Sequence, residues 1–348
     1  MKILNYPIPA NLFYHFRLLL VAVSGLENIL PRQILPLLAN INLTERCNAR
    51  CITCDYWKNK PEDRITTQRA CHLINELLSI NVRNLRFTGG EPLLRADLFE
   101  ILSSVDGARF NKVVLATNGL LLKKYAEKIN ESIITNVTVS LDAKGEKNDS
   151  IRGIKGYYEK IIANLRYINK KIKIVSTLNN LLIDNLEEMI LWCRDNGYEY
   201  DINLPDNNMY FLAGKDVKAA LQKLKLNNEQ IHKVFYLLKK YNVVNGVVLD
   251  NAKAYMISGK FIFKHCMQGY LEVNIDSQGN VRSGCNVFQP IGNILNNSLE
   301  DIINSDDYLN SVKKMFSFDC PGCTCGYGIS ATYGNPLSVW SYIQRRLS

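Results

Sequence analysis

Three cysteines in the first part of the chain have a spacing that suits an iron–sulfur site. Cys47, Cys51 and Cys54 are separated by three and then by two residues. Three thiolates on so short a loop can bind one [4Fe–4S] cube and leave its fourth iron open to a substrate or cofactor. Two other interpretations remain at this point, namely three unrelated cysteines or a zinc site that lacks the fourth ligand usual in structural sites.

A second group of cysteines lies toward the C-terminus: Cys266, Cys285, Cys320, Cys323 and Cys325. The last three form the compact run Cys320-Pro-Gly-Cys323-Thr-Cys325. Four of these five thiolates would saturate a further [4Fe–4S] cluster, and a Cys₄ zinc ribbon is the alternative. The two remaining cysteines, Cys71 and Cys193, fall within helical patterns and are interpreted as packing residues.

We expect these cysteines to lie in a reducing compartment. We find no convincing export signal, so we expect a cytoplasmic protein in which clustered cysteines bind metal rather than form disulfides. The contents of hydrophobic (47%) and charged (22%) residues are ordinary for a globular protein. The net charge of +9 is spread along the chain without a block of like charges, so it favours anionic ligands in general and gives no indication of nucleic-acid binding.

The elements that position these residues follow an alternating pattern. Short runs rich in Val, Ile and Leu recur between amphipathic segments of helical period, which predicts βαβ units and a parallel sheet. Six strands suit a partial barrel better than a closed barrel of eight. The predicted strands are Ala39–Leu43, Leu85–Thr88, Lys112–Thr117, Asn136–Leu141, Ile172–Leu178 and Tyr200–Leu204, and the predicted helices are Arg69–Leu78, Leu98–Val105, Leu120–Ile129, Tyr157–Asn169 and Asn185–Asn196.

Polar and glycine residues follow the predicted strands. Phe87-Thr-Gly89-Gly90-Glu91-Pro92 ends the second strand, and two glycines let the backbone approach a ligand closely. Asn118 follows the third strand, and Ser140 and Asp142 end the fourth. Arg152 comes ten residues after Asp142, and a guanidinium is suited to bind a carboxylate. Because the carboxyl ends of barrel strands share one rim, these residues are expected to gather there with the cysteine loop.

The Cys-x₃-Cys-x₂-Cys loop after the first strand, with the GGEP run at the second, resembles the radical S-adenosylmethionine superfamily. The resemblance implies that the methionyl group of S-adenosylmethionine chelates the open iron. An electron, delivered by a flavodoxin- or ferredoxin-type donor, then cleaves the cofactor to a 5′-deoxyadenosyl radical.

The same resemblance assigns expected contacts. Gly89, Gly90 and Glu91 would bind the methionyl amine, and Arg152 the carboxylate. Ser140 and Asp142 would contact ribose or carboxylate, with Asn118 a weaker candidate. This sequence departs from the family at Thr53, where an aromatic residue is frequent; Tyr56 or Trp57 would supply the apolar wall beside adenine instead.

The C-terminal cysteines resemble the twitch or shortened SPASM module of the same superfamily. The full SPASM pattern needs about seven cysteines for two clusters, so the resemblance implies one auxiliary [4Fe–4S] cluster here. The preferred ligands are Cys266, Cys285, Cys320 and Cys323. Cys325 would either replace one of them or act as a thiol that donates hydrogen to a substrate radical.

The expected organisation has four parts. They are an apolar N-terminal extension (1–36), a partial (β/α)6 barrel (37–214), a helical linker (215–260) and a cysteine-rich module (261–348) that opens with a hairpin at Leu271–Arg282. The stretch over 13–43 is apolar and mildly basic, but its continuous apolar run is too short to span a bilayer. We expect it either to dock on the barrel or to lie on a membrane surface.

The implied reaction begins with hydrogen abstraction from a substrate C–H bond and leads to epimerisation, dehydrogenation or cross-linking. A peptide, a sugar and a lipid-linked substrate all remain open. The alternative is an iron–sulfur electron carrier or redox sensor without S-adenosylmethionine chemistry, which would not need GGEP or an open iron.

Overall fold

The computed structural model describes residues 34–58, 62–203, 223–244, 246–262, 265–286 and 288–320. Nine strands of these residues form one sheet in the order β6-β5-β4-β3-β2-β1-β7-β8-β9. The strands are β1 (Leu38–Thr44), β2 (Asn84–Gly89), β3 (Lys112–Thr117), β4 (Asn136–Ser140), β5 (Lys171–Thr177), β6 (Glu199–Asn203), β7 (Glu272–Ile275), β8 (Asn280–Arg282) and β9 (Gly292–Asn293).

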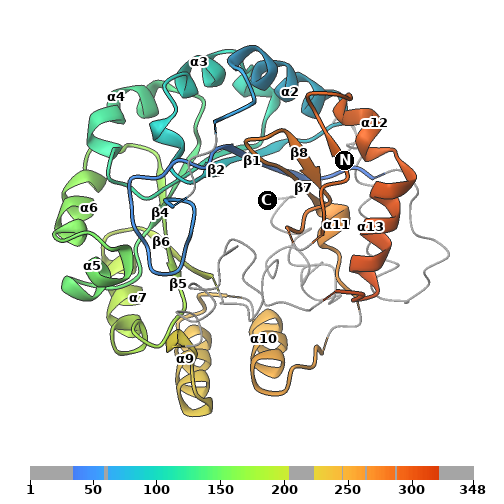
Figure 1. Cartoon of the computed structure of the whole chain (residues 1–348). Helices are drawn as coiled ribbons and strands as arrows, with labels where there is room; N and C mark the ends of the chain where they lie inside the picture. Colours follow the sequence, from blue (N-terminus) through green and yellow to red (C-terminus); the bar gives the residue numbers. More distant parts are fainter. Residues whose placement is uncertain are drawn as a thin grey trace, which may run out of the picture.

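Strands β1 to β6 are all parallel and curve into a partial barrel, and all six strands predicted from the sequence are confirmed (Figure 1). Helices cover the outer face of the sheet. The described helices are α2 (Thr67–Ser79), α3 (Leu98–Ser103), α4 (Leu122–Glu131), α5 (Glu146–Arg152), α6 (Tyr157–Leu165), α7 (Leu186–Asp195), α9 (Asn228–Lys240), α10 (Gly246–Ser258), α11 (Gln268–Leu271), α12 (Leu299–Ile303) and α13 (Asp306–Phe316), with 3₁₀ turns η2 (Pro92–Leu94), η3 (Gly107–Arg109) and η4 (Ile183–Asn185).

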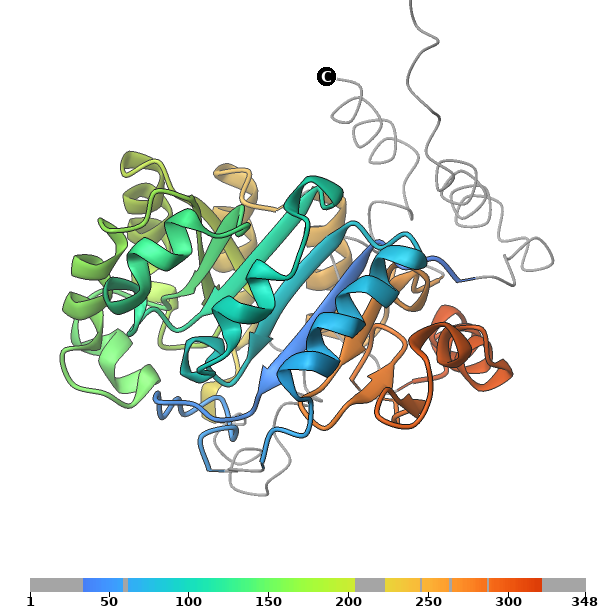
Figure 2. The ribbon, with the colours of Figure 1, turned by 90° about the horizontal axis from the view of Figure 1, so that it is seen from above.

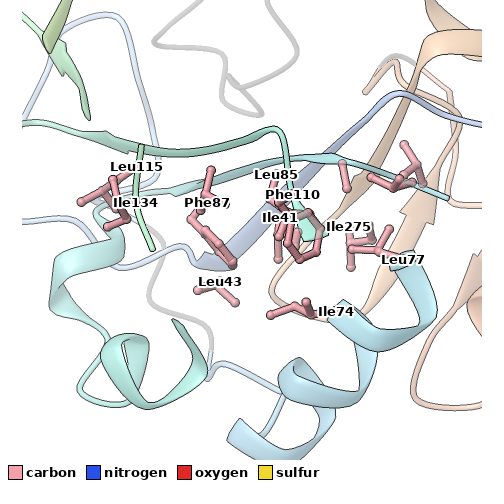
Figure 3. Packing of buried hydrophobic residues seen from close by; sticks show 14 of the residues in the cluster. Ile41, Leu43, Ile74, Leu77, Leu85, Phe87, Phe110, Leu115, Ile134 and Ile275 are labelled. Carbon is pink, nitrogen blue, oxygen red and sulfur yellow. The ribbon is translucent and has the colours of Figure 1, made fainter. Parts of the chain in front are cut away.

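The two faces of the sheet differ in chemistry. Along β1, Ala39, Ile41 and Leu43 are buried in the core against the outer helices, where Figure 3 shows Ile41 and Leu43 with Ile74 of α2. Because strand side chains alternate, Asn40 and Asn42 lie on the opposite, inner face. A parallel sheet covered on both faces is usually apolar throughout, so a polar inner face indicates that the barrel interior binds polar groups.

The C-terminal hairpin extends the barrel sheet. Strand β7 pairs in parallel with β1, from Leu38 beside Glu272 to Ile41 beside Ile275, and β8 follows antiparallel to β7. The hairpin predicted from the sequence is thus confirmed, but the sheet runs without a break across the boundary expected near residue 261. The periodicity of the sequence could not show this, because the pairing of β7 with β1 is a contact between distant segments.

Helix α9 and residues of α10 form a second apolar cluster with α7 and η4. It contains Ile190, Val234, Leu238, Leu249 and Ala252. The capping box at Asn227 and Gln230 fixes the start of α9, since each side chain binds the other residue's backbone N–H. The described part of the expected linker over 215–260 therefore packs on the barrel.

The apolar N-terminal stretch divides in two. Residues 1–33 lie outside the described residues. Ile34 is 1% exposed, and Ala39, Ile41 and Leu43 belong to β1, which lies inside the sheet between β2 and β7. The expectation of membrane contact is therefore wrong for residues 34–43, because their apolar side chains are in the protein core. Among the described helices, none has the length and apolar character needed to cross a membrane.

Candidate functional site

The cysteine triplet lies on the loop that leaves β1, and this loop packs against the end of α5. The backbone N–H of Arg50 donates to the carbonyl of Arg152 (3.1 Å), and that of Ile52 donates to Ile151 (3.0 Å). Figure 2 shows the blue loop running beneath the end of β1 toward the green helices. Gly153 ends α5 with φ +68°, and a Cβ there would lie 2.3 Å from the carbonyl oxygen of Arg50. Glycine therefore allows the close approach of loop and helix.

The two glycines of the GGEP run press against the same loop from β2. A Cβ on Gly89 would lie 2.2 Å from the carbonyl oxygen of Thr44, and one on Gly90 would lie 2.3 Å from that of Arg46. The backbone N–H of Gly90 donates to Thr44, and that of Glu91 donates to Arg46, both at 2.8 Å. The glycines thus hold the segment between β1 and Cys47 against the rim, in addition to any contact with a cofactor.

Glu91 joins β2 to the end of β3. Its side chain is fully buried and accepts hydrogen bonds from the Thr117 hydroxyl (2.8 Å) and from the backbone N–H groups of Asn118 (2.7 Å) and Leu93 (3.1 Å). Burial raises the pKa of Glu91 to about 7, although the three hydrogen bonds lower it. The sequence assigned Glu91 to the methionyl amine, whereas in the structure its hydrogen bonds are within the fold.

Asn118 contacts the cysteine loop directly. Its amide nitrogen donates to the Asn48 side chain (2.7 Å) and lies 3.7 Å from the Cys47 sulfur, while its side-chain oxygen accepts from the Leu120 N–H (3.0 Å). The Tyr157 hydroxyl donates to the Asn118 carbonyl. Asn118 therefore orients Cys47. The contribution of Asn48 was missed, since nothing in the sequence marks it beyond its place in the loop.

Arg152 and Asp142 form a buried ion pair behind the second cysteine. The Nε of Arg152 lies 2.7 Å from Asp142 Oδ2, and a terminal nitrogen lies 3.8 Å from the Cys51 sulfur. Asp142 Oδ1 accepts from the Thr177 N–H (2.7 Å). Burial alone would lower the pKa of Arg152, but the Asp142 carboxylate raises it, so the guanidinium stays charged.

The ion pair was not predicted from the sequence. Arg152 was expected to bind the methionyl carboxylate, and Asp142 was expected to contact ribose or carboxylate; both contacts stay predictions. The structure adds that the two residues bind each other inside the fold. The ten-residue spacing gave no sign that α5 returns Arg152 to the end of β4.

Three polar residues remain on the inner face beside this rim. Asn42 donates to the Tyr56 hydroxyl (3.3 Å), and its side-chain oxygen is buried beside Gly89 without a donor among the described residues. Ser140 ends β4 and is half-buried. Asn42 was not predicted from the sequence, although asparagines at alternate positions of an apolar strand indicate that one face of that strand is polar.

The donor set at the rim fits an iron–sulfur cluster and S-adenosylmethionine. Three soft sulfur ligands lie on one loop. They are close enough that Cys47 and Cys51 raise the pKa of the Cys54 thiol electrostatically. No group of three His, Cys, Asp or Glu residues in the described ranges is close enough to hold a single metal ion. In a [4Fe–4S] cube each thiolate binds a different iron, so the three sulfurs need not converge on one metal position. The orphaned oxygen of Asn42 offers an acceptor for the methionyl ammonium.

The thiols must lose their protons to bind iron. Burial raises the pKa of Cys54 to about 12 and also raises that of Cys47. Arg152 lowers the pKa of Cys54, and the Asn118 amide lowers that of Cys47. The groups that dock the loop therefore also favour the thiolates that a cluster requires.

Three of the five C-terminal cysteines are described, and hydrogen bonds join the segments that carry them. The N–H of Cys266 donates to the carbonyl of Phe316 at the end of α13 (3.2 Å), four residues before Cys320. The Gln268 side chain donates to the carbonyl of Gly284, the residue before Cys285 (3.4 Å). Cys323 and Cys325 lie outside the described residues, so their predicted roles stay predictions.

A pocket of about 900 Å³ lies on the outer side of this region. Its lining belongs to the segment after β8 and to α13, and none of it belongs to the triplet loop or the rim. The pocket is lined by Phe288, Gln289, Pro290, Ile291, Asp307, Asn310, Ser311, Lys313, Lys314, Phe316 and Ser317.

Comparisons with known proteins match both cysteine regions. Residues 41–194 match the Radical SAM superfamily model, and residues 266–325 match the SPASM iron–sulfur cluster-binding domain. The two matches cover the triplet, the strand ends that hold it and all five C-terminal cysteines.

Curated relatives match parts of the chain. A probable GTP 3′,8-cyclase of Archaeoglobus fulgidus is 39% identical over 103 residues, 29% of this chain and 34% of the relative. An AdoMet-dependent heme synthase of Methanosarcina barkeri is 37% identical over 139 residues, 39% of this chain and 40% of the relative. The chain thus matches between a third and two fifths of the length of these relatives.

Solved structures share the fold. Streptococcus suis SuiB bound to precursor peptide SuiA has a TM-score of 0.63 at 17% identity, covering 84% of this chain and 70% of SuiB. Native anSMEcpe with bound AdoMet has a TM-score of 0.61 at 17% identity, covering 90% of this chain and 98% of that one. At this identity the likeness shows the fold alone.

Proposed function

Because the chain belongs to the radical S-adenosylmethionine superfamily and carries a SPASM iron–sulfur domain, we propose that it is an enzyme that removes hydrogen from a substrate C–H bond. The observation that carries the proposal is the docking of the Cys47, Cys51 and Cys54 loop onto the strand ends at Glu91 and Asn118 and onto α5. When bound, the cluster supplies the electron that cleaves S-adenosylmethionine to methionine and a 5′-deoxyadenosyl radical.

The residues around the loop have separate roles in this proposal. The three cysteines ligate the cluster, and Arg152 and Asn118 stabilise the thiolates of Cys51 and Cys47. Asn42 accepts from the methionyl ammonium, together with the peptide edge at Gly89 and Gly90. Ser140 and Tyr56 complete the inner wall, where ribose and adenine would lie.

The auxiliary cluster is proposed to be ligated by Cys266, Cys285, Cys320 and Cys323. Cys325 remains a candidate for the thiol that returns a hydrogen atom to the substrate radical. The electron comes from a flavodoxin- or ferredoxin-type donor, and a cytoplasmic location suits the reduced thiolates.

The reaction outcome is epimerisation, dehydrogenation or cross-linking on a sugar, lipid-linked or peptide substrate. The titles of the structural neighbours include a precursor peptide for SuiB, whereas the curated relatives act on GTP or in heme synthesis. A small-molecule substrate is favoured by the polar, charged inner face of the barrel.

The test is anaerobic reconstitution with iron and sulfide, followed by dithionite and S-adenosylmethionine. We expect the wild type to form 5′-deoxyadenosine without added substrate and the Cys51→Ala variant to form none. A matched Cys71→Ala variant, on α2 away from the loop, should behave as the wild type. Bound iron without 5′-deoxyadenosine in the wild type would overturn the proposal in favour of an electron carrier.

A further inference from the structure

The inner face of the barrel carries a cationic pair that the chemistry above does not use. Arg86 lies in the middle of β2, between Leu85 and Phe87, which are both buried on the helix side. Lys112 begins β3, between Asn111 and the buried Val113. Since side chains alternate along a strand, Arg86 and Lys112 both project to the inner face.

The two cations are neighbours across the sheet. Strand β2 pairs with β3 so that Asn84 lies beside Lys112 and Arg86 beside Val114. Arg86 and Lys112 are therefore diagonal neighbours on the same face, within reach of each other's long side chains. Neither forms an ion pair with a described carboxylate. By contrast, Lys173 on the same face lies 3.5 Å from Glu199 and 3.4 Å from Asp201.

Each cation feels one carboxylate, Glu272 for Arg86 and Glu199 for Lys112. Burial nevertheless lowers the pKa of Lys112, Lys173 and Arg86 lower it further, and Glu199 offsets this only in part. Arg86 is exposed although β2 is the middle strand of the nine-stranded sheet, so solvent reaches this part of the inner face. Like charges gathered in a partly desolvated place favour a ligand of opposite charge.

A second observation points to a ligand at the same place. Asn40 of β1 lies directly beside Arg86 in the sheet register. Its amide nitrogen donates to Glu272 and Asn274, both at 2.8 Å, but its buried oxygen has no donor among the described residues. A ligand that carries both an anionic group and a hydrogen-bond donor would bind the cations and satisfy this oxygen.

We propose that Arg86 and Lys112, with Asn40, bind a carboxylate or phosphate group of the substrate inside the barrel. This inference rests on the proposed function and names its substrate class as an anionic small molecule with a hydrogen-bond donor. Arg86 lies three residues before Gly89, or about 10 Å along the strand. The anionic group therefore binds about that far from the rim, and the reacting C–H bond lies between the two.

The test is binding of simple anions to the reconstituted protein under anaerobic conditions. Inorganic phosphate and succinate are titrated separately at constant ionic strength, and the thermal midpoint is followed, because a ligand that binds the folded state raises it. We expect phosphate, succinate or both to raise the midpoint of the wild type. The more effective probe distinguishes a phosphate from a carboxylate substrate.

Variants of the two cations test whether the anions bind at this place. Arg86→Gln and Lys112→Met should each weaken binding about tenfold or more, since each removes a charge-assisted contact, and Arg86→Lys should retain most of it. The matched controls are Arg194→Gln on α7 and Lys239→Met on α9, both exposed, which should bind as the wild type.

Two results would overturn the inference: no midpoint shift in the wild type with either anion, or an undiminished shift in both Arg86→Gln and Lys112→Met. Formation of 5′-deoxyadenosine by the wild type is measured alongside. If it fails while the anions bind at Arg86 and Lys112, the proposed function is wrong and the anion site stands. If it succeeds while the anions do not bind, only the anion site is wrong.

Discussion

The two cysteine regions of this protein are assembled in opposite ways. Cys47, Cys51 and Cys54 lie on one loop, which is fastened to the ends of β2 and β3 and to α5. Cys266, Cys285 and Cys320 lie in three separate segments: before α11, after β8 and after α13. The first set is local in sequence and held by the barrel, whereas the second forms only when distant elements have packed.

This difference suits two kinds of iron–sulfur site. A loop that supplies three ligands leaves one iron open for a reacting molecule, and the barrel rim supplies the polar groups around it. A site built from several elements can surround a cluster completely, so that it serves structure or electron transfer. The comparison predicts that the two sites can be lost separately.

Removing the triplet should have the largest effect. In the Cys47→Ala/Cys51→Ala/Cys54→Ala variant we expect complete loss of 5′-deoxyadenosine formation, with about four irons still bound per chain at the auxiliary site. Iron and sulfide analysis after anaerobic reconstitution measures this directly. Zinc, or no metal at all, in the triple variant would refute the auxiliary cluster.

Breaking the buried ion pair should cost the most stability. Arg152→Met leaves the Asp142 carboxylate, which is 1% exposed, without its cation, and we expect a loss of about 3–5 kcal/mol in the free energy of unfolding. The double variant Asp142→Asn/Arg152→Met should recover part of the loss. Lys144→Met, which breaks a solvent-exposed pair with Glu188, should cost far less, because water screens that pair. Equal losses for the buried and exposed pairs, measured by denaturant unfolding, would contradict this account.

The buried carboxyl of Glu91, which joins β2 to the end of β3, should make the stability of the folded protein depend on pH. The folded protein holds the Glu91 proton to about pH 7, whereas the unfolded chain releases it near 4.5. This group therefore makes the folded state less stable as pH rises from about 4.5 to about 7, by up to about 3 kcal/mol.

Glu91→Gln cannot titrate, so this part of the pH dependence should disappear. Thermal midpoints of the wild type and the variant at pH 5 and pH 8 measure the difference. Glu100→Gln, an exposed position on α3, serves as the control and should keep the wild-type dependence. An unchanged pH dependence in Glu91→Gln would show that Glu91 does not carry the proton.

Glycine substitutions should affect one cysteine region without the other, at a smaller cost in stability than the loss of the buried ion pair. Gly153→Ala places a methyl group 2.3 Å from the Arg50 carbonyl and should release the triplet loop. Gly284→Ala places one 2.6 Å from the Gln268 carbonyl and should disturb Cys285. We expect Gly153→Ala to lose S-adenosylmethionine cleavage and Gly284→Ala to lose auxiliary iron.

Gly156→Ala is the matched control for backbone strain. Its φ of +71° is close to those of Gly153 and Gly284, but nothing lies within 4 Å of the added methyl group. It should therefore show only the strain of about 1–3 kcal/mol and keep both iron sites. Loss of iron in Gly156→Ala would mean that strain rather than contact explains the other two variants.

The sequence predicted the architecture well because its signals are local. Alternating strand and helix patterns, the triplet spacing and the GGEP run each lie within a few residues. The roles of Arg152 and Asp142 were harder to predict, because their ion pair depends on how α5 returns to the end of β4. The pairing of β7 with β1 and the cationic pair on the inner face likewise depend on register between distant strands, which spacing in the chain does not encode.

The most direct test of the central claim is the electron paramagnetic resonance spectrum of the dithionite-reduced protein with and without S-adenosylmethionine. An open iron on the triplet cluster predicts that the cofactor alters one component of the spectrum and leaves the auxiliary component unchanged. The altered component should be absent from the triple cysteine variant. A spectrum that S-adenosylmethionine leaves unchanged, in protein with both sites loaded, would contradict the account.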